Sequence, residues 1–259
     1  MNILMDLSMY QKEVLQNYKS NSQIARVLTE DWFNREMYCP CCLNEGVSDF
    51  PNNKKGSDFF CEKCGNEFQL KASKNEFRKK VVDGEYNTMI RIISSNNSPN
   101  FFLMNYSNSD WTVRNLFLIP KFFVSLSMIE RRKPLGLNAV RAGWIGCNFL
   151  LDRLPDEGKI QIVRNEKIVD RNGINKIWKK MFFMSSKRPD FNGWTSDVLR
   201  CVEELDDRFS LDEVYSYDKY LRELHPLNNN VRPKIRQQLQ ILRDNKVLRF
   251  EGNGRYVKI

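Results

Sequence analysis

The sequence predicts an α+β protein of two domains, the first with a metal site and the second ending in a β-hairpin. Three observations lead to this prediction. Helix-like and strand-like apolar patterns are mixed along residues 1–186, and two Cys-x2-Cys pairs lie within that stretch. Helical segments followed by a hairpin pattern occupy residues 190–259. A chain of 259 residues is long enough for each domain to bury its own core.

Apolar spacing defines the elements of the first domain, residues 1–186. A capping-box pair, Ser20 and Gln23, precedes apolar residues at helical spacing and predicts a helix over 21–36. Short strands and tight turns are expected around the cysteines. Continuous apolar runs predict strands covered on both faces. The remaining expected elements are a helix at 82–95, strands at 101–106 and 114–119, a hairpin at 158–170 turning near Asn165, and a helix at 172–184.

The second domain, residues 190–259, follows a polar segment at 185–193 that we interpret as a linker. A helix is expected over 195–205. Ser210 and Glu213 form a second capping box, with Phe209 and Val214 at the hydrophobic staple positions. A third helix begins near residue 230, and VLRF, EGNG and RYVKI then read as a hairpin. Three helices followed by a hairpin describe a winged helix.

A winged helix places its third helix in the DNA major groove and its hairpin on the backbone. Residues 232–259 contain eight Lys or Arg against two acidic residues, a net charge of +6, whereas the whole chain carries +9. The alternative for any single residue is a solvated helix face. The candidate DNA contacts are Arg232, Lys234, Arg236, Gln237, Gln240 and Arg243 on the helix, and Arg249, Arg255 and Lys258 on the hairpin.

Several classes of protein are excluded by what the sequence lacks. No apolar run approaches the roughly 18 residues of a membrane span, and the N-terminus lacks a basic signal region, so we expect a cytoplasmic protein without membrane association. No GxxxxGK loop is present, so no nucleotide cofactor is expected. The single histidine, His225, precedes a proline and is interpreted as a surface residue, which excludes multi-histidine sites.

Two Cys-x2-Cys pairs predict a structural zinc site. Cys39, Cys42, Cys61 and Cys64 have the spacing of a tetrahedral site with four thiolate ligands. Cys41 lies in the first pair and is an alternative ligand. Buried free cysteines are the competing interpretation of the whole set.

A second pattern, D-x10-QxK, overlaps the second cysteine pair and is typical of sites that cut phosphodiesters. Asp58, the Gln69 amide oxygen and the Leu70 carbonyl are the expected Mg²⁺ ligands, and Lys71 is expected to hold the attacking water. Alternate residues of a strand share a face, so Gln69 and Lys71 point the same way. A solvated strand face would explain this short pattern equally well.

Segments along nearly the whole chain together resemble one known family. They are YKSNSQIARVLTEDW at 18–32, the four cysteines, PNFFLMNY at 99–106, RKPL with RAGWIGCN at 132–148, and KIRQQLQILRD at 234–244. They are similar to the DpnI-like methyl-directed (type IIM) restriction endonucleases. This resemblance implies a zinc-containing PD-(D/E)XK catalytic domain followed by a winged helix. It also implies cleavage of double-stranded DNA at GATC sites that carry N6-methyladenine.

Within this resemblance, one position departs from the family pattern and one segment is a candidate methyl reader. Gln69 occupies a position where the family has Glu, which should weaken Mg²⁺ binding unless Glu67 or Glu30 compensates. Trp144 beside Arg141 is the candidate wall for the methyl group in the major groove, with a core tryptophan as the alternative.

Three functions are compatible with these features. The first is a methyl-directed endonuclease that acts as a monomer in solution. The second is an inactive or weakened methyl-DNA-binding protein, and the third is a nuclease of changed specificity.

Overall fold

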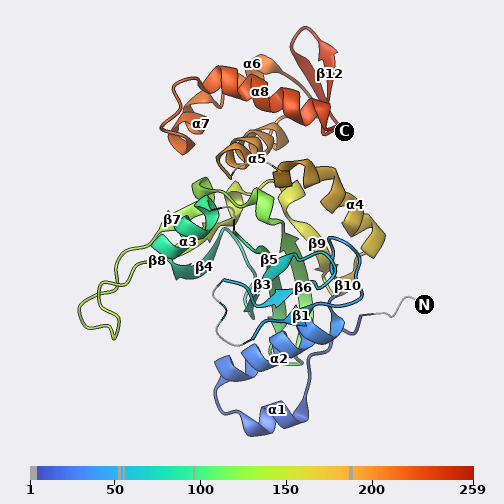
Figure 1. The fold of residues 1–259 in the computed structure, drawn as a ribbon, viewed down its shortest axis with the longest axis vertical. Helices are drawn as coiled ribbons and strands as arrows, with labels where there is room; N and C mark the ends of the chain where they lie inside the picture. Colours follow the sequence, from blue (N-terminus) through green and yellow to red (C-terminus); the bar gives the residue numbers. More distant parts are fainter. Residues whose placement is uncertain (1–4, 52–53, 55, 96, 187–188) are drawn as a thin grey trace. The chain divides into compact units, whose positions relative to one another are not determined.

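The computed structural model describes residues 5–51, 54, 56–95, 97–186 and 189–259 (Figure 1). The chain divides into two compact units. The first unit comprises Met1–Phe77, Ser98–Lys121 and Lys159–Lys179. The second comprises Arg78–Asn97, Phe122–Gly158 and Lys180–Ile259.

A seven-stranded sheet organises the first unit, in the order β1-β2-β3-β5-β6-β9-β10. Only β3 and β5 run parallel among its neighbouring pairs. The mixed direction of the strands agrees with the predicted α+β class. The strands are β1 Ser48–Asp49, β2 Phe59–Phe60, β3 Glu67–Ser73, β5 Asn100–Ser107, β6 Thr112–Ile119, β9 Ile160–Arg164 and β10 Lys167–Ile168.

Strand β5 is the buried centre of this sheet, and only its last residue is partly exposed. The prediction of a strand covered on both faces is therefore confirmed for β5, whereas β6 alternates between buried and partly exposed residues. The predicted hairpin is also confirmed as β9 and β10. Asn165 and Glu166 between them have φ of 48° and 60°, the left-handed backbone that a two-residue hairpin loop requires.

Helices α1 (Lys12–Asn17), α2 (Asn21–Glu36) and α4 (Arg171–Met181) complete the first unit. The Phe33 ring of α2 lies 4.4 Å from Phe59 and 4.8 Å from Phe102, so α2 covers the sheet face that these residues share. The predicted helix over 21–36 is confirmed, but its capping box is wrong. The Ser20 hydroxyl contacts the Ser22 hydroxyl at 2.8 Å instead of capping the helix.

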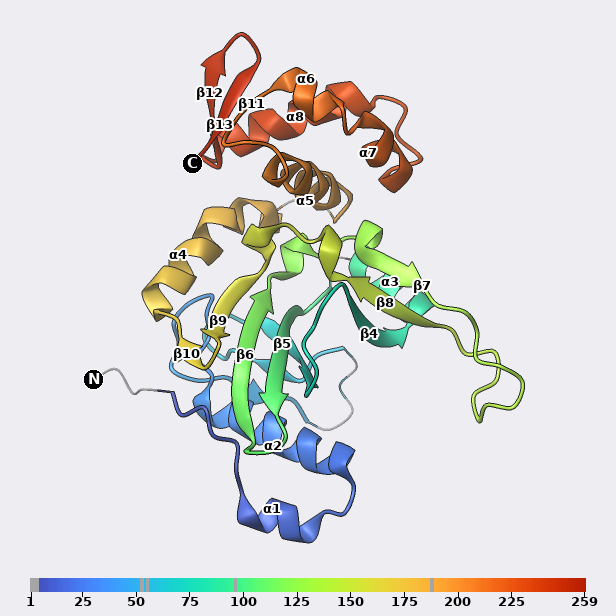
Figure 2. The ribbon, with the colours of Figure 1, turned by 180° about the vertical axis from the view of Figure 1, so that it is seen from behind.

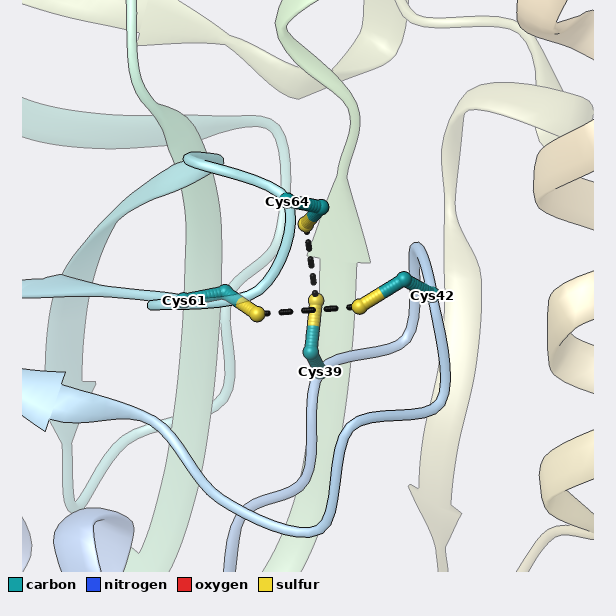
Figure 3. A group of neighbouring side chains, drawn as sticks. All are labelled: Cys39, Cys42, Cys61 and Cys64. Carbon is teal, nitrogen blue, oxygen red and sulfur yellow. Dashed lines mark hydrogen bonds between the residues drawn. The ribbon is translucent and has the colours of Figure 1, made fainter.

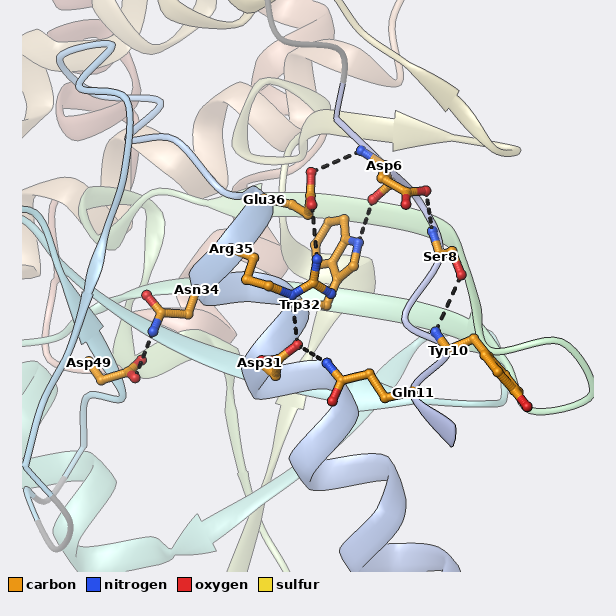
Figure 4. Close-up of polar contacts among 10 residues, drawn as sticks. All are labelled: Asp6, Ser8, Tyr10, Gln11, Asp31, Trp32, Asn34, Arg35, Glu36 and Asp49. Atoms are coloured by element: carbon orange, nitrogen blue, oxygen red, sulfur yellow. Dashed lines mark hydrogen bonds and ion pairs between the residues drawn. The ribbon is translucent and has the colours of Figure 1, made fainter. Parts of the chain in front are cut away.

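The chain before α1 is fastened along α2 (Figure 4). The buried Trp32 indole donates to the Asp6 carbonyl at 2.6 Å, and the Asp6 N–H donates to a Glu36 carboxylate oxygen at 2.9 Å. Gln11 and Arg35 both bond the Asp31 carboxylate. These contacts fix α2, which forms one side of the cleft discussed below.

The second unit contains a small sheet in the order β4-β8-β7, with β4 Lys80–Glu85, β8 Gly146–Leu150 and β7 Ile129–Arg131. Helix α3 (Tyr86–Ser94) follows β4. The predicted start at residue 82 is wrong because 82–85 pair with β8 as a strand. The Glu85 carboxylate caps α3 by accepting from the N–H groups of Asn87 and Thr88.

The winged helix lies in the same unit (Figure 2). Its elements are α5 Pro189–Glu203, β11 Arg208–Ser210, α6 Leu211–Tyr215, α7 Asp218–Leu224, α8 Val231–Asp244, β12 Leu248–Gly252 and β13 Arg255–Lys258. The capping box of Ser210 and Glu213 is confirmed. The expected second helix is split into α6 and α7, and β13 pairs with both β11 and β12.

The predicted linker at 185–193 is partly wrong. Helix α5 begins at Pro189. Proline suits the first position of a helix, because an N–H group there would have no partner within the helix. Residues 187–188 lie outside the described part of the chain. The five-residue 3₁₀ helix Phe182–Ser186 precedes them, after α4 has ended.

His225 is not the surface residue that the sequence predicted. Its ring stacks on Trp194 with 3.9 Å between centroids and lies 2.8 Å from the carboxylate of Asp197, which is 1% exposed. The Ser127 hydroxyl donates to the same carboxylate at 3.1 Å. A buried polar cluster therefore joins α5 to the segment before β7, both within the second unit.

Candidate metal centre and DNA-facing surfaces

Four cysteine side chains meet between the turn that follows α2 and the turn that joins β2 to β3 (Figure 3). The sulfur atoms of Cys39, Cys42, Cys61 and Cys64 all lie within 4.8 Å of one another. Two pairs, Cys39 with Cys64 and Cys42 with Cys61, are 3.6 Å apart. These distances are too long for disulfides, whose bond is about 2.05 Å. They are close to the roughly 3.8 Å edges of a thiolate tetrahedron around zinc at about 2.3 Å.

The two cysteine turns have the same backbone construction. In the first, Cys39 accepts from Leu43 N–H at 2.8 Å and donates to Asn44 at 2.9 Å. In the second, Cys61 accepts from Gly65 at 2.8 Å and donates to Asn66 at 2.9 Å. Leu43 and Gly65, four residues after the first cysteine of each turn, both have positive φ. The repeated geometry presents two sulfurs from each turn to the same point.

A contact from α4 supports the first turn. The Asn175 side-chain amide donates to the carbonyls of Pro40 at 2.9 Å and Cys41 at 3.0 Å. Asn175 is 4% exposed. This support was not predicted from the sequence, because nothing local to α4 indicates a partner about 135 residues earlier in the chain.

The donor set fits zinc and includes Cys42 instead of Cys41. Burial acts against the Cys64 thiolate, but hydrogen bonds from Asn66 lower the pKa of Cys64 to about 7. Burial raises the pKa of Cys42 to about 12, so a cation is needed to stabilise all four thiolates. Soft, deprotonated sulfur ligands in a tetrahedral group are those that zinc prefers.

A polar cleft of about 550 Å³ opens in the first unit. It is lined by side chains of α2, by residues near β1 and by Asp58. Asp58 precedes β2, and its N–H donates to the Phe68 carbonyl at 2.9 Å. Its carboxylate accepts from the Leu70 N–H at 2.9 Å, which places Asp58 against β3 between the predicted residues Gln69 and Lys71.

Burial along strand β3 does not follow the predicted alternation. Phe68 is buried, whereas Gln69, Leu70 and Lys71 are all half-buried, so only the strand geometry places Gln69 and Lys71 on the face opposite Phe68. In the parallel pairing with β5, Gln69 lies beside Phe101 and Lys71 beside Leu103. Asp58 and Leu70 are therefore brought together, and the convergence of the Gln69 and Lys71 side chains on Asp58 stays a prediction.

The two carboxylates considered as compensation for Gln69 differ in their surroundings. Glu67 accepts from Lys54 and from Ser57, each at 2.6 Å; burial opposes its charge, but these bonds lower the pKa of Glu67. Glu30 lines the same cleft as Asp58 and pairs with Arg26 at 2.8 Å. Each of these two carboxylates is therefore paired with a cation, and Glu30 is the one of the two that lines the cleft.

The third helix of the winged helix, α8, carries the predicted polar face. Ile235, Leu239 and Leu242 are buried, whereas the candidate contacts Arg232, Arg236, Gln237, Gln240 and Arg243 are exposed. All three of these arginines have a polar neighbour: Arg232 pairs with Asp218, Arg236 bonds the Tyr215 hydroxyl, and Arg243 pairs with Asp244. Lys234 is half-buried and bonds Gln237.

On the hairpin that follows α8, Arg249 and Arg255 are exposed, and Arg249 pairs with Glu251 at 3.0 Å. Lys258 donates to the backbone carbonyls of Glu203 and Leu205. It therefore holds the hairpin to the end of α5 and is not a free surface cation.

Arg141 and Trp144 lie in the long connection between β7 and β8. Arg141 is exposed and Trp144 is half-buried, so Trp144 does not belong to the buried core. A Cβ atom on Gly146 would come 2.7 Å from the Trp144 ring, which shows that the ring lies directly on this glycine. Only glycine allows the ring to lie so close to the chain at this point.

Two family models match the chain. The DpnI model, described as the Dam-replacing family, matches residues 5–187, and the DpnI_C model, described as the Dam-replacing HTH domain, matches residues 190–258. Among the described helices, none is both long and apolar enough to cross a membrane. Because the first match covers more than half of the sequence, the chain belongs to the DpnI family of restriction endonucleases, with a DNA-binding helix-turn-helix domain at its C-terminal end.

Proposed function

We propose that this protein is a methyl-directed type II restriction endonuclease that cleaves both strands of DNA at GATC sites carrying N6-methyladenine. Family membership supports a nuclease, and the observation that carries the proposal is the position of Asp58. Its carboxylate bonds the backbone of β3 at Leu70, between Gln69 and Lys71, at a polar cleft. A solvated strand face would not by itself account for this contact between an acidic side chain and the neighbouring strand.

The proposed roles follow from the chemistry of each group. Asp58, the Gln69 amide oxygen and the Leu70 carbonyl are hard oxygen donors of the kind that Mg²⁺ prefers. Bound there, Mg²⁺ would neutralise the charge that develops on the phosphate during hydrolysis. Lys71, one residue beyond Leu70, would hold and orient the attacking water. Zinc on the four cysteines would keep the β2–β3 turn in shape beside these groups.

Gln69 sets the expected metal requirement. A neutral amide oxygen attracts a divalent cation less than a carboxylate does, so cleavage should need more Mg²⁺ than in a Gln69→Glu variant. The experiment is digestion of fully methylated GATC plasmid over a range of Mg²⁺ and Mn²⁺ concentrations. Wild type should cut, Gln69→Glu should cut at lower Mg²⁺, and Lys71→Ala should not cut. A wild-type protein that leaves this plasmid intact throughout would refute the proposal.

Methyl recognition is proposed for Trp144, and base or phosphate contacts for the exposed face of α8. Trp144→Ala should abolish the preference for methylated over unmethylated sites. Arg236→Ala or Gln240→Ala should weaken specific binding by roughly 1–3 kcal/mol if the side chain contacts a base. An unchanged preference in Trp144→Ala would reject this assignment while leaving the catalytic proposal intact.

A second candidate is a methyl-DNA sensor that does not cut, and the neutral Gln69 is the observation that favours it. The same plasmid assay separates the two, because only a nuclease releases cut DNA. Digest mapping on defined substrates tests a third possibility, a changed recognition sequence. We also propose a catalytic domain over 1–186, a winged helix over 190–259, and a monomer in solution.

A further inference from the structure

A long arm connects β7 and β8 and is built from residues 131–145. The arm extends away from these strands (Figure 2). Its two sides are joined by backbone hydrogen bonds from Arg132 to Gly146 and from Leu135 to Trp144, at 3.0 and 2.9 Å. Gly143, with φ of +78°, donates back to Leu135 at 3.0 Å. The arm therefore has a defined backbone shape.

The arm carries only positive charge. Arg131, Arg132, Lys133 and Arg141 lie on it, and no acidic residue occurs from residue 131 to residue 151. Within the described part of the chain, Arg132, Lys133 and Arg141 form no ion pair, and all three are exposed. Uncompensated, exposed cations at this density favour a polyanion as the partner.

The end of the arm is apolar and faces solvent. Leu137 is 95% exposed and Val140 is fully exposed. Fully exposed branched aliphatic side chains on an ordered loop gain nothing in the free protein, because their apolar area stays in water. Their exposure is accounted for if a partner covers them.

A second copy of the chain is an unsuitable partner, because two basic arms would repel each other. Duplex DNA satisfies both features at once. Its phosphates attract the cations along the arm, and its stacked bases offer the apolar surface for the tip. Proteins that bend DNA use aliphatic side chains as wedges that partly unstack a base step.

We propose that the arm enters the DNA that the enzyme binds and inserts Leu137 as a wedge between neighbouring base pairs, with Val140 against the flanking base. Arg132, Lys133 and Arg141 hold the arm through phosphate contacts. Unstacking a step at the target makes the adjacent bases easier to reach. This inference rests on the proposed function, because it takes methylated duplex DNA as the ligand.

The test measures base stacking by fluorescence of 2-aminopurine, placed in turn at each position of a methylated GATC duplex and its flanks. Lys71→Ala serves as the background, so that DNA is bound without being cut. At one step the fluorescence should rise several-fold on binding. Leu137→Ser should remove this rise and weaken binding roughly tenfold, the loss expected for one buried leucine side chain.

Leu227→Ser is the matched control, since Leu227 is 98% exposed but lies outside the arm. It should leave both fluorescence and affinity unchanged. Arg141→Ala should keep the rise while lowering the salt slope of binding by about one.

The outcomes separate this inference from the proposed function. Tight, methyl-specific binding with no fluorescence rise at any position, or a rise that persists in Leu137→Ser, overturns the wedge and leaves the nuclease proposal standing. A wild-type protein that binds and unstacks methylated DNA but never cuts it overturns the nuclease proposal and supports the wedge. Absence of any DNA binding overturns both.

Discussion

Asn175 provides a sharp test of how the fold holds the cysteine site. Its amide donates two hydrogen bonds, at 2.9 and 3.0 Å, to the carbonyls of Pro40 and Cys41 in the first cysteine turn. Asn175→Ala would leave both carbonyls without these donors in a protected position. At about 1.5 kcal/mol for each acceptor, the loss in free energy of unfolding is about 3 kcal/mol.

The same substitution should weaken metal binding. Groups that orient ligands without touching the metal typically contribute roughly 10- to 100-fold in affinity. We therefore expect zinc to dissociate from Asn175→Ala at chelator concentrations about 10- to 100-fold lower than from wild type. Competition with a chromophoric zinc chelator measures this affinity, and calorimetry with and without zinc measures stability.

Asn172→Ala is the matched control, because Asn172 lies on the same helix but is exposed. It should bind zinc as the wild type does. If Asn175→Ala and Asn172→Ala behave alike in both assays, the hydrogen bonds from α4 do not support the cysteine turn, and the reasoning is refuted.

Three further predictions concern other parts of the chain. Burial, together with a hydrogen bond to Glu157, raises the pKa of Glu203 from 4.5 to about 9. The protonated carboxyl group therefore gives its full stabilisation to the fold below pH 4.5, and this stabilisation is lost as the pH rises toward 9. Glu203→Gln should unfold at a higher temperature than wild type at pH 9 and similarly at pH 5; parallel pH profiles would contradict this. Cys64→Ser should lose bound zinc by metal analysis, whereas Cys41→Ser should retain it. Ser127→Ala removes a donor to the Asp197 carboxylate and should lower stability to urea by about 1–3 kcal/mol; an unchanged midpoint would count against the buried cluster.

The features that sequence predicted best are those fixed by short-range geometry. The cysteine turns need two residues between their ligands. The capping box needs Glu213 three positions after Ser210, so that its two hydrogen bonds can form. Strand β5 was recognised by a run of apolar residues, because a strand buried on both faces has no polar side. Each of these signals is complete within about a dozen residues.

Several predictions that failed depend on partners far away in the chain, whereas the capping box at Ser20 failed locally, because its hydroxyl contacts Ser22. His225 looked like a turn residue, but Trp194 and Asp197 occupy its two sides. The start of α3 depends on β8 pairing with residues 82–85 across more than sixty residues. Sequence spacing alone carries no information about such pairings. The placement of Asp58 against Leu70, by contrast, joins β3 to the residue that precedes the neighbouring strand β2, and was suggested by the cysteine hairpin between them.

Helix α5 has a practical consequence for experiments that divide the protein. The match to the helix-turn-helix model begins at residue 190, yet the partners of α5 include the Ser127 hydroxyl and, for Arg200, the Asp152 carbonyl at 3.2 Å. A truncated chain starting at that boundary would remove the Ser127 donor from Asp197 and the Asp152 carbonyl from Arg200, and would uncover the side of α5 that these groups protect. Affinities measured on such a fragment would describe an altered helix, so substitutions on α8 in the intact chain are the sounder way to apportion DNA recognition.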